Sequence, residues 1–556
     1  ALGTANLAAK IGVDSAQLSL TDMKGTLDGA DAQGGLAVRL GSKLGVSGGL
    51  TLDRLLLDPW LPDGAVLDRP AAAYTAAVKA LASSSFDTDL KLLVKQANWR
   101  GARFGPLAFD VQSEAGRLTV RRFEISVAGL HATASGTLGD GGRVSEGRLE
   151  LMAQEIAPLQ PFIPHDTAWV TPLVKGPANL LVVIAGPPEA LGVKATLDLG
   201  DLRAEMQPVL NIPARRWAGP LMLHHPGAPR LLEQLGFGGT ASWLGDGSFS
   251  AITQLSHAPG RLELGTIDLV AGGMRLTGQV SQVDQMVQGR LRAETLMLPA
   301  IDLRSVEPLP FAALASHAAT IHLDADQVMI GTRPGITEAA LDAEVKDGAL
   351  SLTSLVAKFG GGTVALSAKM QPGDRPRVSV QGQTEGVDIS GPVLGGTLDL
   401  VAGTLKSKFS LESAGFSPAA LVATLSGSGN AGVLDGGVVG LDAAAAKDAL
   451  LHSETGKLAP ALRPALLGGS TVFSTIDIPF DIQRGILALR AQGTAASGAV
   501  SLNGTIDLTG GTLEGRLTLL PGPDLPDLPV RLSGPVANPV RTPELAGAAL
   551  WLAERP

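Results

Sequence analysis

GRLTVRRFEISVAG, residues 116–129, alternates apolar and polar side chains between two glycines and breaks that alternation once. Its apolar side chains stand two, four, seven, nine and eleven residues after Gly116. Alternation with a period of two predicts a β-strand with one apolar face. The single three-residue step, from Val120 to Phe123, predicts a β-bulge or kink that keeps the apolar side chains on one face.

The same thirteen-residue frame returns along the chain. It begins again at Gly260 and at Gly348, and a degenerate copy begins at Gly485. A strand of this kind cannot bury its apolar face alone, so the copies must stack side by side. The expected fold is therefore mainly β: an elongated, twisted, repetitive sheet curled into an open apolar groove, with a few short capping helices. The expected groove residues are Leu118, Val120, Phe123, Ile125, Val127, Leu262, Leu264, Ile267, Leu269, Leu350, Leu352, Leu355, Phe359, Leu487 and Leu489.

The composition describes a chain that is unusually apolar for its length. Only 17% of the 556 residues are charged, against a usual value of about 25%, and the chain contains 70 glycines. Its mean hydropathy is +0.23. No stretch approaches the roughly 20 apolar residues of a membrane-spanning helix. The apolar surface is therefore expected to lie along the sheet.

Charge and cysteine content exclude several classes of function. The net charge is -9 without a basic run, which argues against nucleic acid and against a polybasic membrane anchor. The absence of cysteine excludes disulfides, thiolate catalysis and cysteine metal sites.

Proline, alanine and capping residues predict a few helices among the strands. Pro70 opens an alanine-rich helix over 70–82, residues 229–235 predict a second, and Asp442 caps a third over 443–452. The proline-containing stretch from there to 469 is expected to be irregular. Thr542-Pro543-Glu544 predicts the start of a last helix that covers one end of the sheet. The expected segments are 1–69 (N-terminal strands), 70–85 (short helix), 86–226 (groove strands), 227–237 (short helix), 238–439 (groove strands), 440–469 (helical insertion), 470–540 (C-terminal strands) and 541–556 (C-terminal helix).

Two motifs that suggest a ligand lack the context that they need. Gly427-x-Gly429-x-x-Gly432 matches the dinucleotide-binding pattern, but no helix follows it to hold a phosphate. His224-His225 is the only adjacent histidine pair, and the remaining histidines lack metal-ligand spacing, so we expect surface or loop histidines. The sequence therefore predicts no cofactor and no metal.

Carboxylates recur next to turns and are expected on the wet outer face or at strand ends, where they discourage edge pairing. They are Asp87, Asp89, Asp324, Asp326, Asp399, Asp477 and Asp507. No Ser-His-Asp or paired-acid arrangement can be assembled from the sequence. We expect that the protein is not an enzyme.

The last third of the chain carries a series of glycine-bounded apolar motifs. They are GVDI at 386–389, GTLDL at 396–400, LSGSG at 425–429, DGGVVGLD at 435–442, IDIPF at 476–480, GTIDL at 504–508 and PVRLSGPVANP at 529–539. In this order they resemble the C-terminal, periplasmic region of the AsmA family, which is related to bridge-like lipid-transfer proteins and to TamB.

That resemblance implies a protein of the Gram-negative cell envelope, located in the periplasm and anchored to the inner membrane. The chain starts without methionine or a signal peptide, so we expect a fragment whose N-terminal membrane helix is missing. The implied function is non-enzymatic lipid transport between the inner and outer membranes, which supports outer-membrane integrity. The implied partners are a phospholipid or another membrane lipid, the inner membrane and outer-membrane proteins.

An apolar groove suits such cargo on physical grounds. A phospholipid exposes roughly 30 methylenes, which at about 0.8 kcal/mol each amount to about 24 kcal/mol against free transit through water. The apolar positions of the repeats are therefore expected to contact lipid. Aromatic residues make up only 4% of the chain, and a lining of interchangeable aliphatic side chains favours sliding over capture.

Two other functions fit the same strand pattern. An assembly factor for outer-membrane β-barrel proteins would offer an exposed, unpaired strand edge. A structural β-solenoid would have a closed and dry inner face. A lipid conduit instead needs a continuous apolar floor that remains accessible.

Overall fold

The structure is a computed structural model that describes residues 4–58, 70–99, 102–127, 129–155, 176–235, 244–309, 318–331, 333–454 and 456–554. The chain divides into two units, Ala1–Ser281 and Gln282–Pro556, which we call unit 1 and unit 2. The boundary between the units falls within strand β18 (Met274–Val283).

The fold class predicted from the sequence is confirmed, because 65% of the residues lie in strands and 11% in helices. The strands that precede the boundary are β1 (Ala5–Val13), β2 (Gln17–Leu27), β3 (Ala30–Arg39), β4 (Leu44–Leu56), β5 (Phe86–Trp99), β6 (Ala102–Phe104), β7 (Leu107–Glu114), β8 (Arg117–Val127), β9 (Leu130–Leu138), β10 (Val144–Ala153), β11 (Ala178–Gly186), β12 (Leu191–Leu199), β13 (Leu202–Met206), β14 (Val209–Asn211), β15 (Arg216–His225), β16 (Phe249–Ala258) and β17 (Arg261–Ala271).

The strands of unit 2 are β19 (Met286–Leu298), β20 (Ala318–Ile330), β21 (Arg333–Lys346), β22 (Ala349–Phe359), β23 (Gly362–Gln371), β24 (Arg377–Ser390), β25 (Asp399–Ala414), β26 (Ser426–Val439), β27 (Ser470–Gln483), β28 (Ile486–Ala495), β29 (Gly498–Asp507), β30 (Thr512–Leu520), β31 (Leu528–Pro535) and β32 (Val540–Pro543). The helices in the described part of the chain are short: α1 (Pro70–Ala82), α2 (Ala228–Gln234), α3 (Pro418–Thr424), α4 (Ala443–His452), α5 (Leu458–Leu467) and α6 (Ala546–Glu554).

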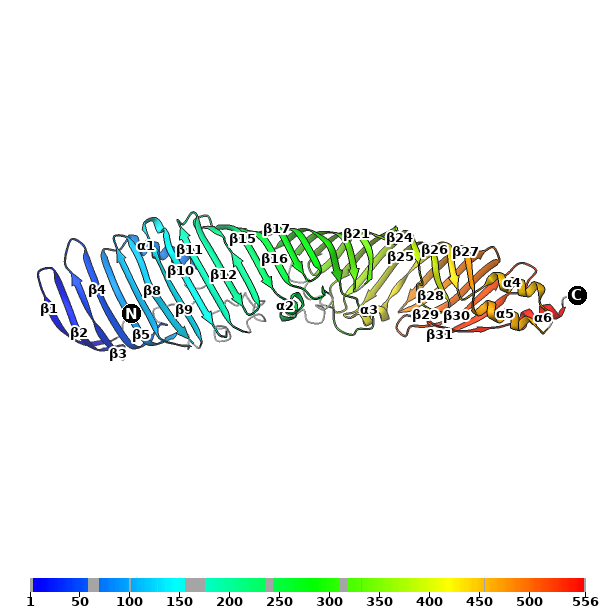
Figure 1. Cartoon of the computed structure of the whole chain (residues 1–556), viewed down its shortest axis with the longest axis horizontal. Coiled ribbons are helices and arrows are strands. Elements are labelled where there is room, and N and C mark those ends of the chain that lie inside the picture. Colours follow the sequence, from blue (N-terminus) through cyan, green and yellow to red (C-terminus); the bar gives the residue numbers. More distant parts are fainter. Residues whose placement is uncertain are drawn as a thin grey trace. The chain divides into compact units, whose positions relative to one another are not determined.

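Within each unit, most strands lie beside their neighbours in the chain and run antiparallel to them (Figure 1). Two of the pairs in the described part of the chain are parallel. In β4 and β5, Leu44 lies opposite Phe86, and in β19 and β20, Met286 lies opposite Ala318. A parallel pair requires a connection that returns the chain to the same end of the sheet. Helix α1 belongs to the first of these connections, and the sequence predicted neither parallel pair.

The three-residue step of the repeat is a β-bulge, as predicted. The register of β8 with β9 shifts between Val120 and Phe123, and that of β22 with β23 shifts between Leu352 and Leu355. In β17 the shift includes Thr266, whose φ is +49°. Each bulge adds one residue and thereby keeps the apolar side chains before and after it on one face. The degenerate copy in β28 pairs with β29 without such a shift.

Three helix predictions are confirmed. Helices α1 and α2 lie where they were expected, and α4 has the predicted N-cap. The carboxylate of Asp442 accepts a hydrogen bond from the backbone N–H of Ala445 at 2.8 Å. This bond satisfies one of the N–H groups that the first helical turn leaves without a partner.

Two expectations at the C-terminal end are wrong. The stretch expected to be irregular contains α5, which tolerates Pro464 because burial of Leu462 and Leu466 stabilises it. Thr542 and Pro543 do not open the last helix. They pair with β31 as part of β32, and α6 begins only at Ala546. Hairpin pairing with the preceding strand β31 outweighs the capping signal here.

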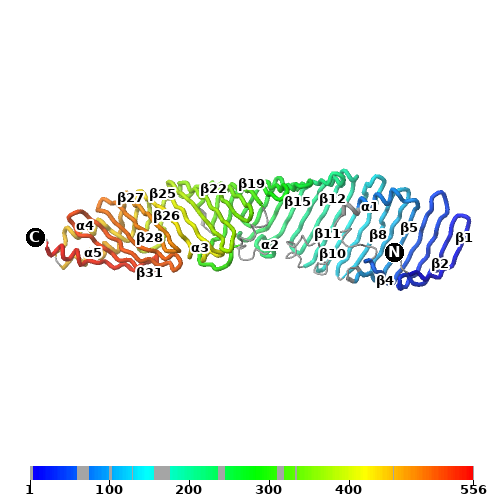
Figure 2. The backbone as a smooth tube through the Cα atoms, turned by 180° about the vertical axis from the view of Figure 1, so that it is seen from behind, coloured from blue at the N-terminus to red at the C-terminus, as the bar shows by residue number. Residues whose placement is uncertain are grey.

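Fully buried apolar side chains gather at the margins of the sheet. In unit 1 they follow one line of strand ends: Val127 and Ala153 end β8 and β10, while Leu130 and Ala178 begin β9 and β11. In unit 2 the core lies between α4, α5 and α6 and the strands β27 and β29–β31. Figure 2 shows α4 and α5 at the C-terminal end of the chain, next to β27 and β31. Helices α4–α6 therefore cover the last strands of the sheet.

Candidate functional site

A continuous row of apolar residues crosses the strands of unit 1. Each member is the direct cross-strand partner of the next, and direct partners point to the same face of a sheet. The row is Met23, Gly34, Leu50, Leu92, Phe109, Phe123, Ala134, Leu149, Val182, Ala195, Met206, Leu221 and Thr253. Thr253, its one polar member, donates its hydroxyl hydrogen to the carbonyl of Gly265 at 3.0 Å.

Unit 2 contains a row of the same kind. It is Leu291, Leu323, Leu341, Leu355, Leu366, Gly382, Phe409, Gly429, Phe480, Leu489, Gly504, Gly515 and Leu532. No polar side chain interrupts it. With neighbouring strands about 4.8 Å apart, thirteen strands extend the row over about 58 Å.

The other face of the unit 2 sheet is polar along the same strands. One run of cross-strand partners on that face is Ser367, Gln381, Ser410, Ser428, Asp481, Ala488, Thr505, Glu514 and Ser533. The sheet of unit 2 is thus sharply two-sided. An antiparallel sheet with this pattern normally packs its apolar face against a core and leaves its polar face in water.

Among the described residues, no such core packs against most of the apolar row. Its first members, from Leu291 on β19 to Leu366 on β23, are all only partly buried. Among the side chains of the row itself, burial is complete only at Leu532, in the core beneath α4–α6. Along the line of the row the apolar face is therefore partly accessible over β19–β28, although Ala325, Met370 and Val433 elsewhere on that face are buried.

The structure places the predicted groove residues on this apolar face. Phe123, Leu355 and Leu489 are members of the two rows, and Leu264 and Leu352 lie beside them, opposite Leu255 and Ala343. Several residues lie at the ends of their strands instead of in the middle of the face. Val127 belongs to the buried core of unit 1, while Phe359, at the end of β22, is 45% exposed.

Sequence analysis missed the central members of the unit 2 row. Gly382, Phe409, Gly429 and Phe480 alternate along it, and the two phenyl rings lie over the two glycines. A Cβ added at Gly429 would stand 2.4 Å from the Phe480 ring. The signal exists in the sequence as glycine on one strand and phenylalanine on the next, but only the register brings them together.

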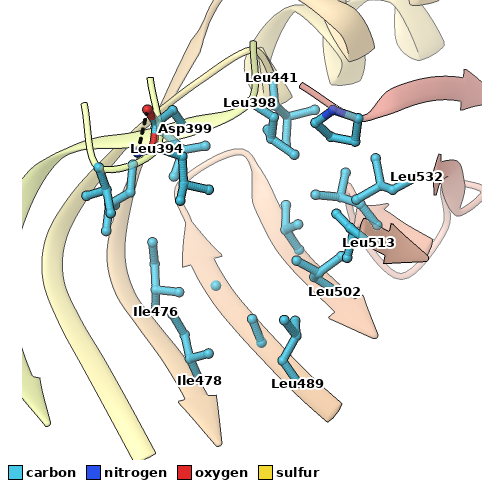
Figure 3. A pocket seen from close by; sticks show the side chains of 18 of the residues that line it. Leu394, Leu398, Asp399, Leu441, Ile476, Ile478, Leu489, Leu502, Leu513 and Leu532 are labelled. Carbon is cyan, nitrogen blue, oxygen red and sulfur yellow. Dashed lines mark hydrogen bonds between the residues drawn. The ribbon is translucent and has the colours of Figure 1, made fainter. Parts of the chain in front are cut away.

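One cavity of about 280 Å³ lies at the end of this row in unit 2. Figure 3 shows Ile476, Ile478 and Leu489 on one side of it and Leu398, Leu441 and Leu532 on the other. Its volume is near the lower end of the range for ligand pockets, about 300–1,000 Å³. The residues that line it are apolar, apart from Asp399.

A connection that we call the strap, residues 391–398 between β24 and β25, forms part of the cavity wall. Thr397 donates its hydroxyl hydrogen to Oδ1 of Asn538 at 3.1 Å, which joins the strap to the turn between β31 and β32. A Cβ added at Gly396 would stand 1.8 Å from the carbonyl oxygen of Ala537. The strap and that turn are therefore in direct backbone contact.

Asp399 holds the strap and is unavailable to a ligand. The side chain is 3% exposed, and its carboxylate accepts hydrogen bonds from the backbone N–H groups of Leu394, at 3.0 Å, and Gly395, at 2.6 Å. Asp399 stands at a strand end, which is one of the two expected places, and it is buried there. Its position is set by the turn that precedes β25.

Arg541 links strand β32 to two other segments of unit 2. Its guanidinium donates hydrogen bonds to the carbonyls of Gly440 and Leu467, each at 2.5 Å. Burial lowers the pKa of this guanidinium from its ordinary value. These bonds join β32 to Gly440, which follows β26, and to Leu467, the last residue of α5.

Charged groups with shifted pKa values lie on the polar face. A hydrogen bond with Lys43 lowers the pKa of Asp87, and a hydrogen bond with Arg275 lowers that of Asp268. A hydrogen bond with Asp342 raises the pKa of His322. None of these groups lines the cavity. Paired charges of this kind are typical of a sheet face that is in contact with water.

The histidine pair and the glycine motif have structural roles in this fold. His225 is fully buried, which contradicts the expectation of a surface histidine, and its Nδ1 accepts a hydrogen bond from the N–H of Gly227 at 3.1 Å. Gly427, Gly429 and Gly432 lie on β26 and pair with strands on both sides. No group of three or more His, Asp or Glu side chains gathers around a metal-sized space in the part of the chain that the structure describes.

Comparison with known proteins finds no match among family models, curated proteins or solved structures. The resemblance to the AsmA family therefore stays a prediction. Among the residues described, no helix has the length and hydropathy needed to span a membrane.

Proposed function

We propose that the chain is a non-enzymatic lipid carrier that holds hydrocarbon against the apolar face of its sheet. The observation that supports this most directly is the uninterrupted apolar row of unit 2, which is partly exposed to solvent and lies on a sheet whose other face is polar. A half-exposed apolar face of this extent marks a surface that binds something apolar.

The extent of the row suits lipid tails. A bilayer core is about 30 Å thick and contains two leaflets, so one tail spans about 15 Å. A row of about 58 Å thus offers room for roughly four tails end to end. Covering the 30 or so methylenes of one phospholipid offsets up to about 24 kcal/mol of exposure to water. The polar headgroup remains in water, because the face is open.

The proposed location is the bacterial envelope. The motifs of residues 386–539 resemble the AsmA family, whose members act in the periplasm on the inner-membrane side. On this proposal the chain transfers phospholipid or another membrane lipid between the inner and outer membranes and so supports outer-membrane integrity. Its partners are the lipid, the inner membrane and outer-membrane proteins.

Native mass spectrometry with lipid extraction tests the proposal. The chain is purified from cells without detergent, and its bound lipid is identified and counted. We expect more than one lipid per chain, because the rows are longer than a single tail. A chain that purifies without lipid and also takes up no fluorescent phospholipid from vesicles would overturn the proposal.

A specific observation favours a second function, that of an assembly factor for β-barrel proteins. Strand β1 pairs with β2, and no partner strand lies along its other edge among the described residues. Apolar side chains of this strand are exposed to solvent: Ile11 is 70% exposed and Val13 is 72% exposed. An edge of this kind can accept a further strand.

The two functions are separated by a substitution at this edge. Ile11→Lys places a charge on the edge strand of unit 1 and changes no residue of the unit 2 row. If the chain prevents aggregation of a purified, unfolded β-barrel protein and the variant does not, assembly is favoured. If the variant still carries lipid, the two activities belong to different surfaces. The third alternative, a closed solenoid, conflicts with the partial exposure of the unit 2 row.

A further inference from the structure

We propose that the cavity at the C-terminal end of the unit 2 row is a closed-ended binding site for the methyl end of one unbranched alkyl chain. This inference rests on the proposed function, and it assigns a distinct role to one place on the apolar face: lipid travels along the row and stops here. The cavity is lined by the side chains shown in Figure 3.

The cavity continues the row. Leu489 is a member of the row and also lines the cavity, and Ile478 lies on the same face of the neighbouring strand β27. Beyond Leu489 the next two members are Gly504 and Gly515, where β29 and β30 approach so closely that a Cβ at either would stand less than 3 Å from a carbonyl oxygen: 2.8 Å at Gly504 and 2.9 Å at Gly515. The residues that flank these glycines, Leu502 and Leu513 among them, form the walls. A chain lying along the row therefore enters the cavity without leaving the apolar face.

The cavity is closed at its far end. Phe473, Leu513 and Leu532 line it and also belong to the buried core under α4–α6. On its other side the strap is fastened to the turn after β31 by the bond between Thr397 and Asn538. An alkyl chain that enters from the row meets packed side chains instead of an exit. The cavity therefore ends within the protein and does not continue through it.

The chemistry of the lining specifies the ligand. The one carboxylate in the lining, that of Asp399, is already held by two backbone N–H groups, and no other charged side chain lines the space. A cavity without free polar groups holds no ordered water and favours an apolar occupant. At roughly 30 Å³ per methylene-sized group, a volume of about 280 Å³ accepts about nine carbons. It has no means of binding a headgroup, so the methyl end enters.

Photocrosslinking with two fatty-acid probes tests this on the unmodified chain. One hexadecanoic acid carries a diazirine at its methyl end and the other carries it next to the carboxyl group. We expect the methyl-end probe to label peptides that contain Ile478, Leu489 and Leu502 at least fivefold more than the carboxyl-end probe does. The carboxyl-end probe is expected to label strands that precede β27.

The results separate this inference from the proposed function. If both probes label the unit 2 row evenly, without enrichment at the cavity, the chain carries lipid but the cavity is not a binding site for the methyl end. If neither probe labels the apolar face, the proposed function itself is wrong and the inference falls with it.

A substitution that fills the cavity with a larger side chain provides an independent test of alkyl-chain binding. Leu502→Trp places a large side chain in the cavity, and Thr505→Trp makes a matched change on the polar face of the same strand, β29. Calorimetric titration with decanoic acid is expected to show a site in the parent and in Thr505→Trp that weakens at least tenfold in Leu502→Trp. Circular dichroism establishes that each variant is folded, and Ile478→Trp replaces Leu502→Trp if the latter does not fold. Equal affinity in all three proteins would contradict the inference.

Discussion

Thr397 and Asn538 are 141 residues apart in the chain, and the hydroxyl of the first donates a hydrogen bond to the side-chain oxygen of the second at 3.1 Å. The bond fastens the strap to the turn between β31 and β32. Gly396 lies against the same turn and Gly440 lies against Thr397, so close that a Cβ at either would stand within about 2 Å of a carbonyl oxygen. Backbone contact at both glycines makes this the tightest point around the cavity.

Gly396→Ala is expected to destabilise unit 2. The new methyl group would stand 1.8 Å from the carbonyl of Ala537, so the strap must move away from the turn. Overpacking of this kind costs about 1–3 kcal/mol. Urea denaturation measures the loss. The matched control is Gly373→Ala, where the nearest atom to the new Cβ is 3.9 Å away, and similar stability of the two variants would contradict the close approach.

A charge on the apolar face is expected to block lipid transfer and leave the fold mostly intact. Leu352→Asp and Leu264→Lys place a charge where a tail would lie, on a face that water already reaches. Fluorescent phospholipid transfer between vesicles is expected to fall at least tenfold in both. The control is Ser351→Asp on the polar face of β22, between Lys369 and Glu344.

Two outcomes of that experiment would count against the proposed function. Normal transfer by both apolar-face variants would show that lipid does not use this face. Complete unfolding of both, with Ser351→Asp folded, would show that the face is a closed core. Thermal melting of all three variants distinguishes these results.

Deletion of Thr266 is expected to be tolerated better than deletion of Glu263 in the same strand. Thr266 belongs to the bulge, so its removal restores strict alternation and leaves Ile267 and Leu269 on the apolar face. Removal of Glu263 leaves the bulge in place and turns the residues on one side of it to the wrong face. Thermal melting is expected to show the larger loss for the Glu263 deletion. Equal losses would mean that the bulge does not control the register.

The stability of unit 2 is expected to fall as the pH rises above neutrality. His322 lies on the polar face, with Nδ1 2.7 Å from Asp342 and Nε2 3.2 Å from Asp324. A hydrogen bond with Asp342 raises its pKa in the folded chain, while the unfolded value is about 6.5. The stabilisation is therefore complete below about pH 6.5 and is lost as the pH rises through the folded pKa.

Urea denaturation of the parent and of His322→Gln between pH 6 and pH 9 measures this effect. The parent should lose stability over that range more steeply than the variant, which has no imidazole to deprotonate. Parallel pH profiles for the two proteins would show that the histidine does not contribute. Titration of His322 by NMR gives the folded pKa directly.

The predictions that succeeded depended on short-range patterns. The frame from Gly116 to Gly129 predicted the strand, its apolar face and the bulge between Val120 and Phe123, because all three follow from spacing within one strand. The cap at Asp442 is equally local. The capping signal at Thr542 and Pro543 failed, because these residues pair with the preceding strand β31 in a hairpin and do not begin a helix.

The sequence by itself determined that this is a mainly β protein, which residues share the apolar face of the repeat strands, and where α1, α2 and α4 lie. Those properties depend on side chains a few positions apart. Only the tertiary structure decided that the phenyl rings of Phe409 and Phe480 lie over Gly382 and Gly429. It also decided that the strap meets Asn538 to bound a cavity. The physical reason is that these contacts join residues tens to more than a hundred positions apart, whose approach depends on strand register and on the packing of the whole unit.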